Sequence, residues 1–384
     1  MSTSVETDGG LRAAVVGEPS LGELPLSTQL MVGGSVAFDL VLRTALASAI
    51  SIPAAVWALR DDPREQVRQL AFYTELAEAH DPARVFRAPE QTPTVTELAA
   101  PRFSFRAPGG SVRMLRFESP FEALNPAMRA EYAHFIENRT AWAQHWRHDD
   151  GPRPTLAVIH GFGASPYWLN SMFFSLPWFY RFGYDVLLYL LPFHGVRQAH
   201  AGLSGIGLFG HGPAHLNEAI VHAVHDFRVF ADYLEASGVP QVGLTGLSLG
   251  GYVSSLLAAV DERLAVVIPN APVVRIGALS RRWFPANLLL SGARLVGLDA
   301  ETFEATLAVH CPLNYPPVVA HERLMIIGGL GDRLAPPEQA SMLWEHWEHP
   351  RLHWFPGNHI LHAGRGIYLK QMLAFMQAAG FKPE

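Results

Sequence analysis

The chain has 384 residues, of which 49% are hydrophobic and 17% are charged, a balance that excludes an intrinsically disordered protein. A chain of this length can bury a large hydrophobic core and can hold more than one domain. The formal net charge of −6 gives no electrostatic reason to expect nucleic acid as a partner.

Residues 1–100 are predicted to form a helical extension in front of the main domain. The acidic, polar start of the chain is unlike a secretory signal peptide, and the single cysteine, Cys311, is typical of a reducing compartment. The most apolar stretch, residues 44–59, has 16 residues and includes Pro53, whereas a membrane-spanning helix needs about 20 apolar residues. We therefore expect a cytoplasmic protein in which one or two buried helices pack on the main domain. A membrane-surface contact is the less favoured alternative.

Two further elements are predicted before the main run of strands. Residues 101–119 have strand-like sequence on both sides of Gly109 and Gly110, which indicates a β-hairpin. A helix is predicted from about Pro126, and a polar, proline-containing turn ends it before residue 155.

From residue 155 onward, short apolar runs alternate with segments of helical spacing. Each run is continuously apolar, which is typical of strands covered on both faces. Residues 215–238 instead have apolar residues at helical spacing before a glycine. Alternating strands and helices predict an α/β fold with a doubly wound, mostly parallel sheet. The predicted strands are 155–161, 184–192, 242–246, 264–270, 324–329 and 352–357.

Ser248 lies in a Gly-x-Ser-x-Gly sequence, between Gly246 and Gly250, after the predicted strand 242–246 and before a helix. This is the pattern of a nucleophile elbow, in which a tight turn exposes the serine hydroxyl at the carboxyl end of the sheet. The two glycines remove side chains that would collide as the strand and the helix come together. Ser248 is therefore the candidate nucleophile.

A serine needs a base that accepts its proton, and the base needs an acid that orients it. Asp332 follows a predicted strand and His359 follows the next one, so the chain order is serine, aspartate, histidine. In these motifs the sequence resembles the α/β-hydrolase superfamily, over roughly residues 101–384. The resemblance implies that Ser248 is the nucleophile, His359 the general base and Asp332 the orienting acid.

The strand that ends near residue 161 leads into a His-Gly turn that resembles the oxyanion turn of the same superfamily. Backbone N–H groups stabilise the negative oxygen of an acyl-transfer transition state without moving. The resemblance implies that Phe162 and Leu249 supply these N–H groups. His160, at the start of the turn, is expected to have a structural role.

The other histidines are weaker candidates. His353 falls inside a predicted strand, and His362 lies beyond the loop, where a surface or structural role is expected. Six more histidines occur between residues 194 and 225, but no cysteine and few acids accompany them. We expect this set to be solvated or hydrogen-bonded, with no metal site. The serine chemistry needs no cofactor.

The segment at about residues 276–315 is longer than a short crossover needs, and its apolar helical pattern predicts a lid inserted into the domain. Tyr167 and Trp168 are candidates to line an apolar substrate pocket. We therefore expect a hydrolase that cleaves an apolar carboxylic ester through an acyl-enzyme. The alternatives are a serine peptidase of the acyl-peptide or aminopeptidase kind and a non-catalytic hydrolase-like binding protein. Acyl transfer to an alcohol and the oligomeric state stay open.

Overall fold

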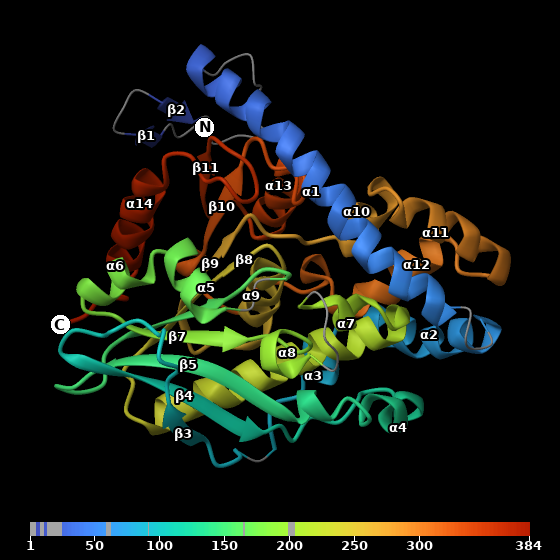
Figure 1. Ribbon diagram of the computed structural model, residues 1–384, viewed down its shortest axis with the longest axis horizontal. Helices are drawn as coiled ribbons and strands as arrows, with labels where there is room; N and C mark the ends of the chain where they lie inside the picture. Colours follow the sequence, from blue (N-terminus) through green and yellow to red (C-terminus); the bar gives the residue numbers. More distant parts are fainter. Residues whose placement is uncertain are drawn as a thin grey trace.

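A nine-stranded sheet runs through the centre of the molecule, in the order β11-β10-β9-β8-β6-β7-β5-β4-β3 (Figure 1). Neighbouring strands from β11 to β7 are parallel, and the remaining pairs, β7 to β3, are antiparallel. The predicted α/β fold with a mostly parallel sheet is therefore confirmed. The computed structural model describes residues 5–7, 11–13, 25–58, 63–90, 92–163, 166–198 and 204–384.

The parallel strands are short, nearly fully buried, and overlap the apolar runs of the sequence. They are β6 (Thr155–Ile159), β7 (Asp185–Leu190), β8 (Val242–Leu247), β9 (Leu264–Asn270), β10 (Met325–Gly329) and β11 (Arg351–Phe355). The antiparallel strands are β3 (Thr96–Ala99), β4 (Gly110–Glu118) and β5 (Thr140–His148). A separate two-stranded sheet is formed by β1 (Val5–Thr7) and β2 (Leu11–Ala13).

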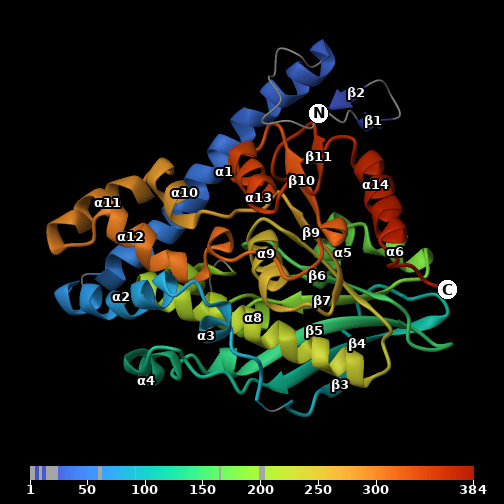
Figure 2. The ribbon, with the colours of Figure 1, turned by 180° about the vertical axis from the view of Figure 1, so that it is seen from behind.

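Helices cover both faces of the central sheet, as Figures 1 and 2 show from opposite sides. The helices of one face are α8 (Gly212–Ala236), α9 (Leu249–Val260) and α13 (Pro337–His346). Those of the other face are α5 (Tyr167–Phe173), α6 (Leu176–Arg181) and α14 (Arg365–Ala378). Alternate residues of one strand enter the two cores: in β6, Ala157 and Ile159 join the α8 side, and Leu156 and Val158 join the α14 side. The sheet is thus doubly wound.

The predicted hairpin around Gly109 and Gly110 is wrong in its first strand. β4 begins at Gly110, but its antiparallel partners are β3, which lies earlier in the chain, and β5, which lies later. Residues 101–108 form no strand; there the Phe105 ring stacks on Trp146, with the ring centroids 4.2 Å apart. The sheet therefore begins inside the segment that was predicted as a helical extension.

The helix predicted from Pro126 is also much shorter than expected. A single 3-10 turn covers Pro126–Met128, and α4 covers only Arg129–Tyr132 before the chain enters β5. The sequence pattern hides β5 because Gln144 and His145 interrupt its apolar residues, although both side chains are buried. The sheet therefore contains one more internal strand than the sequence pattern indicates.

Helix α1 (Leu26–Ala58) is a single helix of 33 residues. It lies against α7 (Ile206–Phe209), α8 and α11 (Ala286–Ala293), and its first half passes the edge of the sheet near β10 and β11 (Figure 1). By length and composition alone, the part Leu26–Val56 is apolar enough to cross a membrane. The predicted apolar stretch is thus part of a longer element.

The two sides of α1 are unusual in composition. The prediction of one or two buried helices is wrong in part, because α1 exposes most of its large apolar side chains. Small or polar residues fill its buried positions: Thr28, Val32, Asp39, Ala47 and Ser51. Large apolar residues are exposed: Leu26, Leu30, Met31, Phe38, Leu40, Val41, Ile52 and Val56.

Three helices fill the long connection between β9 and β10, namely α10 (Ile276–Arg282), α11 and α12 (Ala300–Leu307). α12 packs against α2 (Pro63–Glu78), and α11 packs against α1. Figures 1 and 2 show these helices gathered beside the sheet at one end of the molecule. The connection and the N-terminal helices therefore form one continuous helical body.

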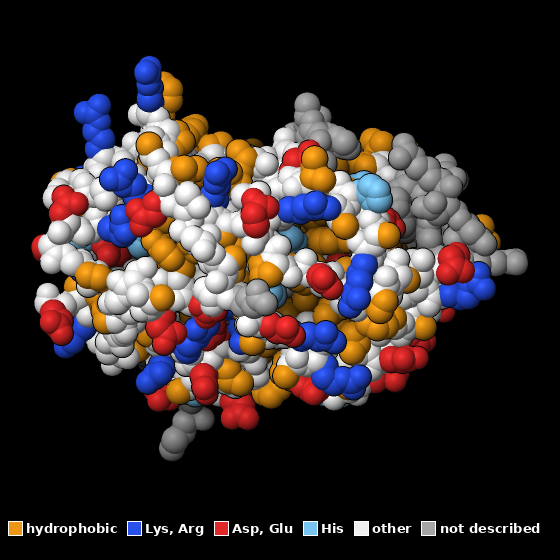
Figure 3. Space-filling view, turned by 90° about the horizontal axis from the view of Figure 1, so that it is seen from below, with side chains coloured by type: hydrophobic (Ala, Val, Ile, Leu, Met, Phe, Trp, Pro, Cys, Tyr) orange, Lys and Arg blue, Asp and Glu red, His pale blue; other side chains and the backbone are white. Residues whose placement is uncertain are grey.

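Charged side chains of both signs lie on the face of the molecule that is seen from below. On the face seen from below, acidic and basic side chains are interspersed (Figure 3). A protein that tracks a nucleic-acid backbone gathers its basic side chains along one stripe. The charge distribution of this face therefore gives no support to a nucleic-acid partner.

Candidate active site

Ser248 occupies a strained turn between β8 and α9. Its backbone angles are φ 56° and ψ −111°, a left-handed region that costs a non-glycine residue free energy and is found at functional sites. A Cβ at Gly246 would collide with the carbonyl of Gly250, and a Cβ at Gly250 would collide with the carbonyl of Ile159. The two glycines therefore allow α9 to begin immediately beside β6.

Asp332 and His359 form a buried pair. His359 Nδ1 lies 2.6 Å from Asp332 Oδ2, and both side chains are almost completely buried. The other carboxylate oxygen of Asp332 accepts hydrogen bonds from the N–H groups of Leu334 and Ala335, at 2.9 and 2.7 Å. The aspartate is thus fixed, and it fixes the imidazole so that Nε2 remains available for other chemistry.

The charge of the site favours the protonated form of His359. Burial on its own lowers the pKa of an imidazole. At His359 the charge of Asp332, its hydrogen bond and the charge of Asp39 outweigh burial, so the pKa is raised above its ordinary value. The imidazole is therefore a stronger base than one that is merely buried.

Ser248, Asp332 and His359 lie at one edge of the sheet. They follow β8, β10 and β11, and parallel strands place their carboxyl ends together. Within the described residues no hydrogen bond joins the Ser248 hydroxyl to His359. Hydrogen bonds of catalytic groups are often long before substrate binds. The contact between serine and base therefore stays a prediction.

The predicted oxyanion turn lies beside Ser248. β6 and β8 are neighbours in register, and a Cβ at Gly161 would be 3.6 Å from the Cβ of Ser248. Phe162 follows Gly161, and Leu249 follows Ser248 as the first residue of α9. Both turns therefore meet at the serine, and the roles of the two N–H groups stay predictions.

His160 connects the ends of two strands. Its Nε2 accepts a hydrogen bond from the N–H of Leu191 at 3.2 Å, and its Nδ1 donates to the carbonyl of Gly161 at 2.8 Å. Burial lowers the pKa of His160 to about 4, so the ring is neutral near pH 7. This position agrees with the structural role expected for it.

The two weaker histidine candidates are buried. His362 Nε2 lies 3.2 Å from the carbonyl of His359, and its Nδ1 lies 3.0 Å from the Tyr368 hydroxyl. Burial lowers the pKa of His362 to about 3. His353 is inside β11, where burial lowers its pKa to about 4. Both rings are neutral near pH 7, and His362 contacts the backbone of His359 directly.

A second serine–histidine–aspartate group lies within the histidine-rich region. The hydroxyl of Ser119 lies 3.1 Å from His222 Nε2, which lies 3.0 Å from Asp226 Oδ2. Arg197 donates to the same carboxylate oxygen at 2.7 Å, and Arg197 and Asp226 are fully buried. Because the guanidinium neutralises the aspartate inside the core, this group is a structural network rather than a catalytic one.

Other histidines of this region, His194 and His215, are also buried rather than solvated, and His194 Nδ1 donates to the carbonyl of Pro192 at 2.8 Å, as the hydrogen-bonded alternative predicts. His200 lies outside the described residues. Among the described residues no three or more His, Cys, Asp or Glu side chains are grouped to hold a metal ion. The histidines therefore contribute to the core of this region.

Tyr167 and Trp168 begin α5, on the α14 side of the sheet. Tyr167 packs on the core there, and the Trp168 side chain is 53% exposed. Neither residue lines a cavity described below, so their predicted role in a substrate pocket gains no support from their position.

Two cavities lie near the helices that follow β9. An apolar cavity of about 540 Å³ is walled by α1, α2, the start of α8, and α10 to α12. Phe209 lines it, and the Phe209 ring packs edge-on against Phe162 of the oxyanion turn, with the centroids 5.4 Å apart. This cavity therefore approaches the candidate site.

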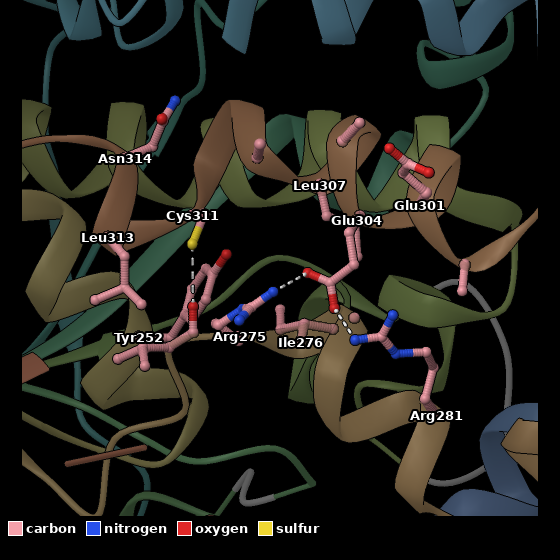
Figure 4. Close-up of a pocket in the computed structure, with 15 residues that line it drawn as sticks. Tyr252, Arg275, Ile276, Arg281, Glu301, Glu304, Leu307, Cys311, Leu313 and Asn314 are labelled. Carbon is pink, nitrogen blue, oxygen red and sulfur yellow. Dashed lines mark hydrogen bonds and ion pairs between the residues drawn. The ribbon is translucent and has the colours of Figure 1, made fainter. Parts of the chain in front are cut away.

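The second cavity, of about 750 Å³, lies between α9, α10 and α12 (Figure 4). Glu304 forms ion pairs across it with Arg275 and Arg281, both at 3.3 Å. The Cys311 thiol donates to the carbonyl of Val274, and burial raises the pKa of Cys311 to about 11. Its thiol stays protonated near pH 7 and is no nucleophile.

Two residues of α1 that the sequence did not indicate also contact the loops that carry Asp332 and His359. Asp39 of α1 is fully buried, and its Oδ2 accepts hydrogen bonds from the N–H groups of Arg333 at 2.9 Å and His359 at 3.1 Å. The backbone carbonyl of Ser35, one turn earlier, accepts from Asn358 Nδ2 at 3.0 Å. The only sequence signal of this contact is an acidic residue inside a long apolar stretch.

No protein-family model matches the chain. The chain is 30% identical over 311 residues to the uncharacterized protein Rv2627c of Mycobacterium tuberculosis strain H37Rv, and equally to the uncharacterized protein MT2702 of strain CDC 1551. The matched segment covers 77% of this chain and 70% of each relative.

Two solved structures resemble the fold. Acetyl xylan esterase 1 from Thermoanaerobacterium sp. JW/SL YS485 has a TM-score of 0.56 at 17% identity, covering 80% of this chain and 93% of that one. An acetyl xylan esterase from Paenibacillus sp. R4 has a TM-score of 0.54 at 15% identity, covering 80% and 94%. The similarity extends over almost the whole of both esterases.

Proposed function

The chain belongs to the same family as Rv2627c and has the α/β-hydrolase fold, and from this premise we propose that it is a serine hydrolase of carboxylic esters. The observation that carries the proposal is the buried contact between His359 and Asp332, at the edge where Ser248 occupies its strained turn. The hydrolase domain would begin at β3, a few residues before the predicted boundary at residue 101, and extend to residue 384, with the N-terminal helices packed on it.

The proposed reaction passes through an acyl-enzyme. His359 Nε2 accepts the proton of Ser248, whose oxygen attacks the ester carbonyl, and the N–H groups of Phe162 and Leu249 stabilise the negative oxygen. The carbon–oxygen bond to the alcohol breaks, and the imidazolium returns its proton to the departing alcohol. Water, activated by His359, then releases the acid. Asp332 holds the imidazole and stabilises its positive charge.

The apolar cavity supports an apolar acyl group as the substrate. Its volume of about 540 Å³ lies within the usual range for small-molecule sites, and Phe209 connects it to the oxyanion turn. Leu288, Leu289 and Leu290 of α11 form part of its wall. The segment 276–315 would therefore act as the predicted lid, and its movement would admit the acyl chain.

The two solved neighbours are named as acetyl xylan esterases, and an acetyl group would use little of this cavity. A series of esters with increasing acyl length decides between a short and a long acyl group. An acyl-peptide substrate in the same series tests the peptidase alternative, and an added alcohol acceptor tests acyl transfer.

The first experiment is labelling with a fluorophosphonate, which reacts with an activated serine. We expect the natural chain to be labelled, Ser248→Ala to be unlabelled, and Ser237→Ala, which changes an exposed serine, to be labelled normally. Absence of labelling in a folded natural chain would favour the non-catalytic binding protein.

A further inference from the structure

We propose that Asp39 of α1 is a positioning residue that joins two loops of the site. The acid loop follows β10 and contains Asp332, and the histidine loop follows β11 and contains His359. The inference rests on the proposed function, because it assigns Asp39 to the site of Ser248, His359 and Asp332. Helix α1 is therefore part of the active site, although its residues precede the hydrolase domain in the sequence.

A single oxygen of Asp39 joins the two loops. Oδ2 accepts the N–H of Arg333, the residue directly after Asp332, at 2.9 Å, and the N–H of His359 itself at 3.1 Å. The loops belong to neighbouring strands, β10 and β11. Their separation is therefore fixed at the two backbone positions that carry the acid and the base.

A second contact of α1 supports the same loops. The Ser35 carbonyl accepts from Asn358 Nδ2, and the Asn358 side-chain oxygen accepts the N–H groups of Ile360 and Leu361 at 3.1 and 2.6 Å. A Cβ at Gly331 would lie only 2.8 Å from Ser35 Oγ, so the helix is in close contact with the backbone beside the acid. One face of α1 thus holds both loops.

The burial of Asp39 argues against a simple packing role. Its side chain is fully buried, and among the described residues its second oxygen, Oδ1, has no hydrogen-bond partner. A buried carboxylate with an unpaired oxygen costs free energy, and apolar packing of the same helix would avoid that cost. The two hydrogen bonds from the loops to Oδ2 offset this free-energy cost.

The charge at this position also acts on His359. Three titratable groups face the imidazole: Asp332 from the acid loop, Asp39 from α1, and His362, whose ring is neutral. Burial and the nearby charge of Asp332 raise the pKa of Asp39, while its two backbone hydrogen bonds oppose that change. When Asp39 is ionised, it favours the imidazolium that forms as the serine loses its proton.

Two substitutions separate position from charge. Asp39→Asn keeps an oxygen that can accept both N–H groups and removes the charge, whereas Asp39→Ala removes both. We expect kcat of Asp39→Ala to fall by about 100-fold, the scale of a 1 Å misplacement, with KM changed much less. Asp39→Asn should retain kcat within about 5-fold of the natural chain, because its amide oxygen can still accept both N–H groups and keep the loops in position. Thr44→Ala, an exposed change on α1, is the control and should retain full activity.

The deciding measurement is NMR titration of His359 in histidine-labelled full-length protein, with the resonance assigned by His359→Gln. The pKa of His359 should be lower in Asp39→Asn than in the natural chain, and the proton between His359 and Asp332 should be lost or broadened in Asp39→Ala. Unchanged spectra in both variants would overturn the proposal. Since this measurement needs no turnover, an inactive but normally titrating natural chain would contradict the proposed function instead.

Discussion

The Nδ1 of His359 and the Oδ2 of Asp332 are 2.6 Å apart, and neither side chain is open to solvent. A contact of this kind orients the imidazole and selects the tautomer that leaves Nε2 without a proton. The pair therefore fixes the orientation of the imidazole, and we predict that its Nε2 points toward Ser248, which follows β8.

Replacing Asp332 by asparagine should abolish most of the activity without unfolding the protein. The amide would favour the wrong imidazole tautomer, and in an analogous triad this change lowers kcat by about 10⁴-fold. Steady-state hydrolysis of a chromogenic ester measures the effect, with Asp150→Asn as an exposed control. A decrease below about tenfold would mean that Asp332 is not the orienting acid.

The activity should decrease in acid at a pH above the ordinary histidine value. His359 acts as a base only when neutral, and its pKa is raised above 6.5. The protonated form therefore persists to higher pH, and kcat/KM decreases as the pH falls through that raised value. The pH profile of kcat/KM on a neutral ester measures it. An acidic limb below 6.5 would contradict the charge environment described here.

Gly250→Ala should destabilise the fold. The added methyl group would collide with the carbonyl of Ile159, in backbone that cannot move independently of β6, so we expect a loss of about 3 kcal/mol or more in the free energy of unfolding. Urea denaturation measures this loss. Gly292→Ala is the matched control, because a Cβ there meets nothing within 4 Å and lies on helix α11. It should be neutral or stabilising by up to about 1 kcal/mol.

Filling the apolar cavity should shorten the preferred acyl chain. Ala54 of α1 lines this cavity, so Ala54→Phe should reduce kcat/KM for long-chain esters while acetate esters are little affected. Each methylene excluded from an apolar site costs about 0.8 kcal/mol, or roughly fourfold in kcat/KM. A uniform loss across all chain lengths would show that the cavity does not receive the acyl group.

The sequence predicted the parallel half of the sheet well because its strands are buried on both faces and are therefore continuously apolar. β5 does not follow that pattern, since Gln144 and His145 are polar and yet buried between neighbouring strands. The segment 101–108 failed for the opposite reason: Phe105 is strand-like, but it packs on Trp146 instead of pairing. Local composition cannot distinguish these cases.

The candidate site also has one part that the sequence predicts and another part that it does not. Gly246, Ser248 and Gly250 are local signals, because the turn that they form is encoded within five residues. Asp39 is conspicuous only as an acid within an apolar stretch, which does not reveal its role, because its partners Arg333 and His359 lie 294 and 320 residues away. Only the folded arrangement of α1 against the two loops shows that Asp39 lies beside the candidate active site.

The contact between Asp39 and His359 has a consequence for biosynthesis. Ribosomes add about 5 to 20 residues per second, so Asp39 is synthesised roughly 16 to 64 s before His359, which is 320 residues later. Until then Asp39 and Ser35 of α1 lack the backbone and side-chain partners that they have in the folded protein. The site as we propose it is therefore complete only after β11 and the loop that carries His359 have been synthesised.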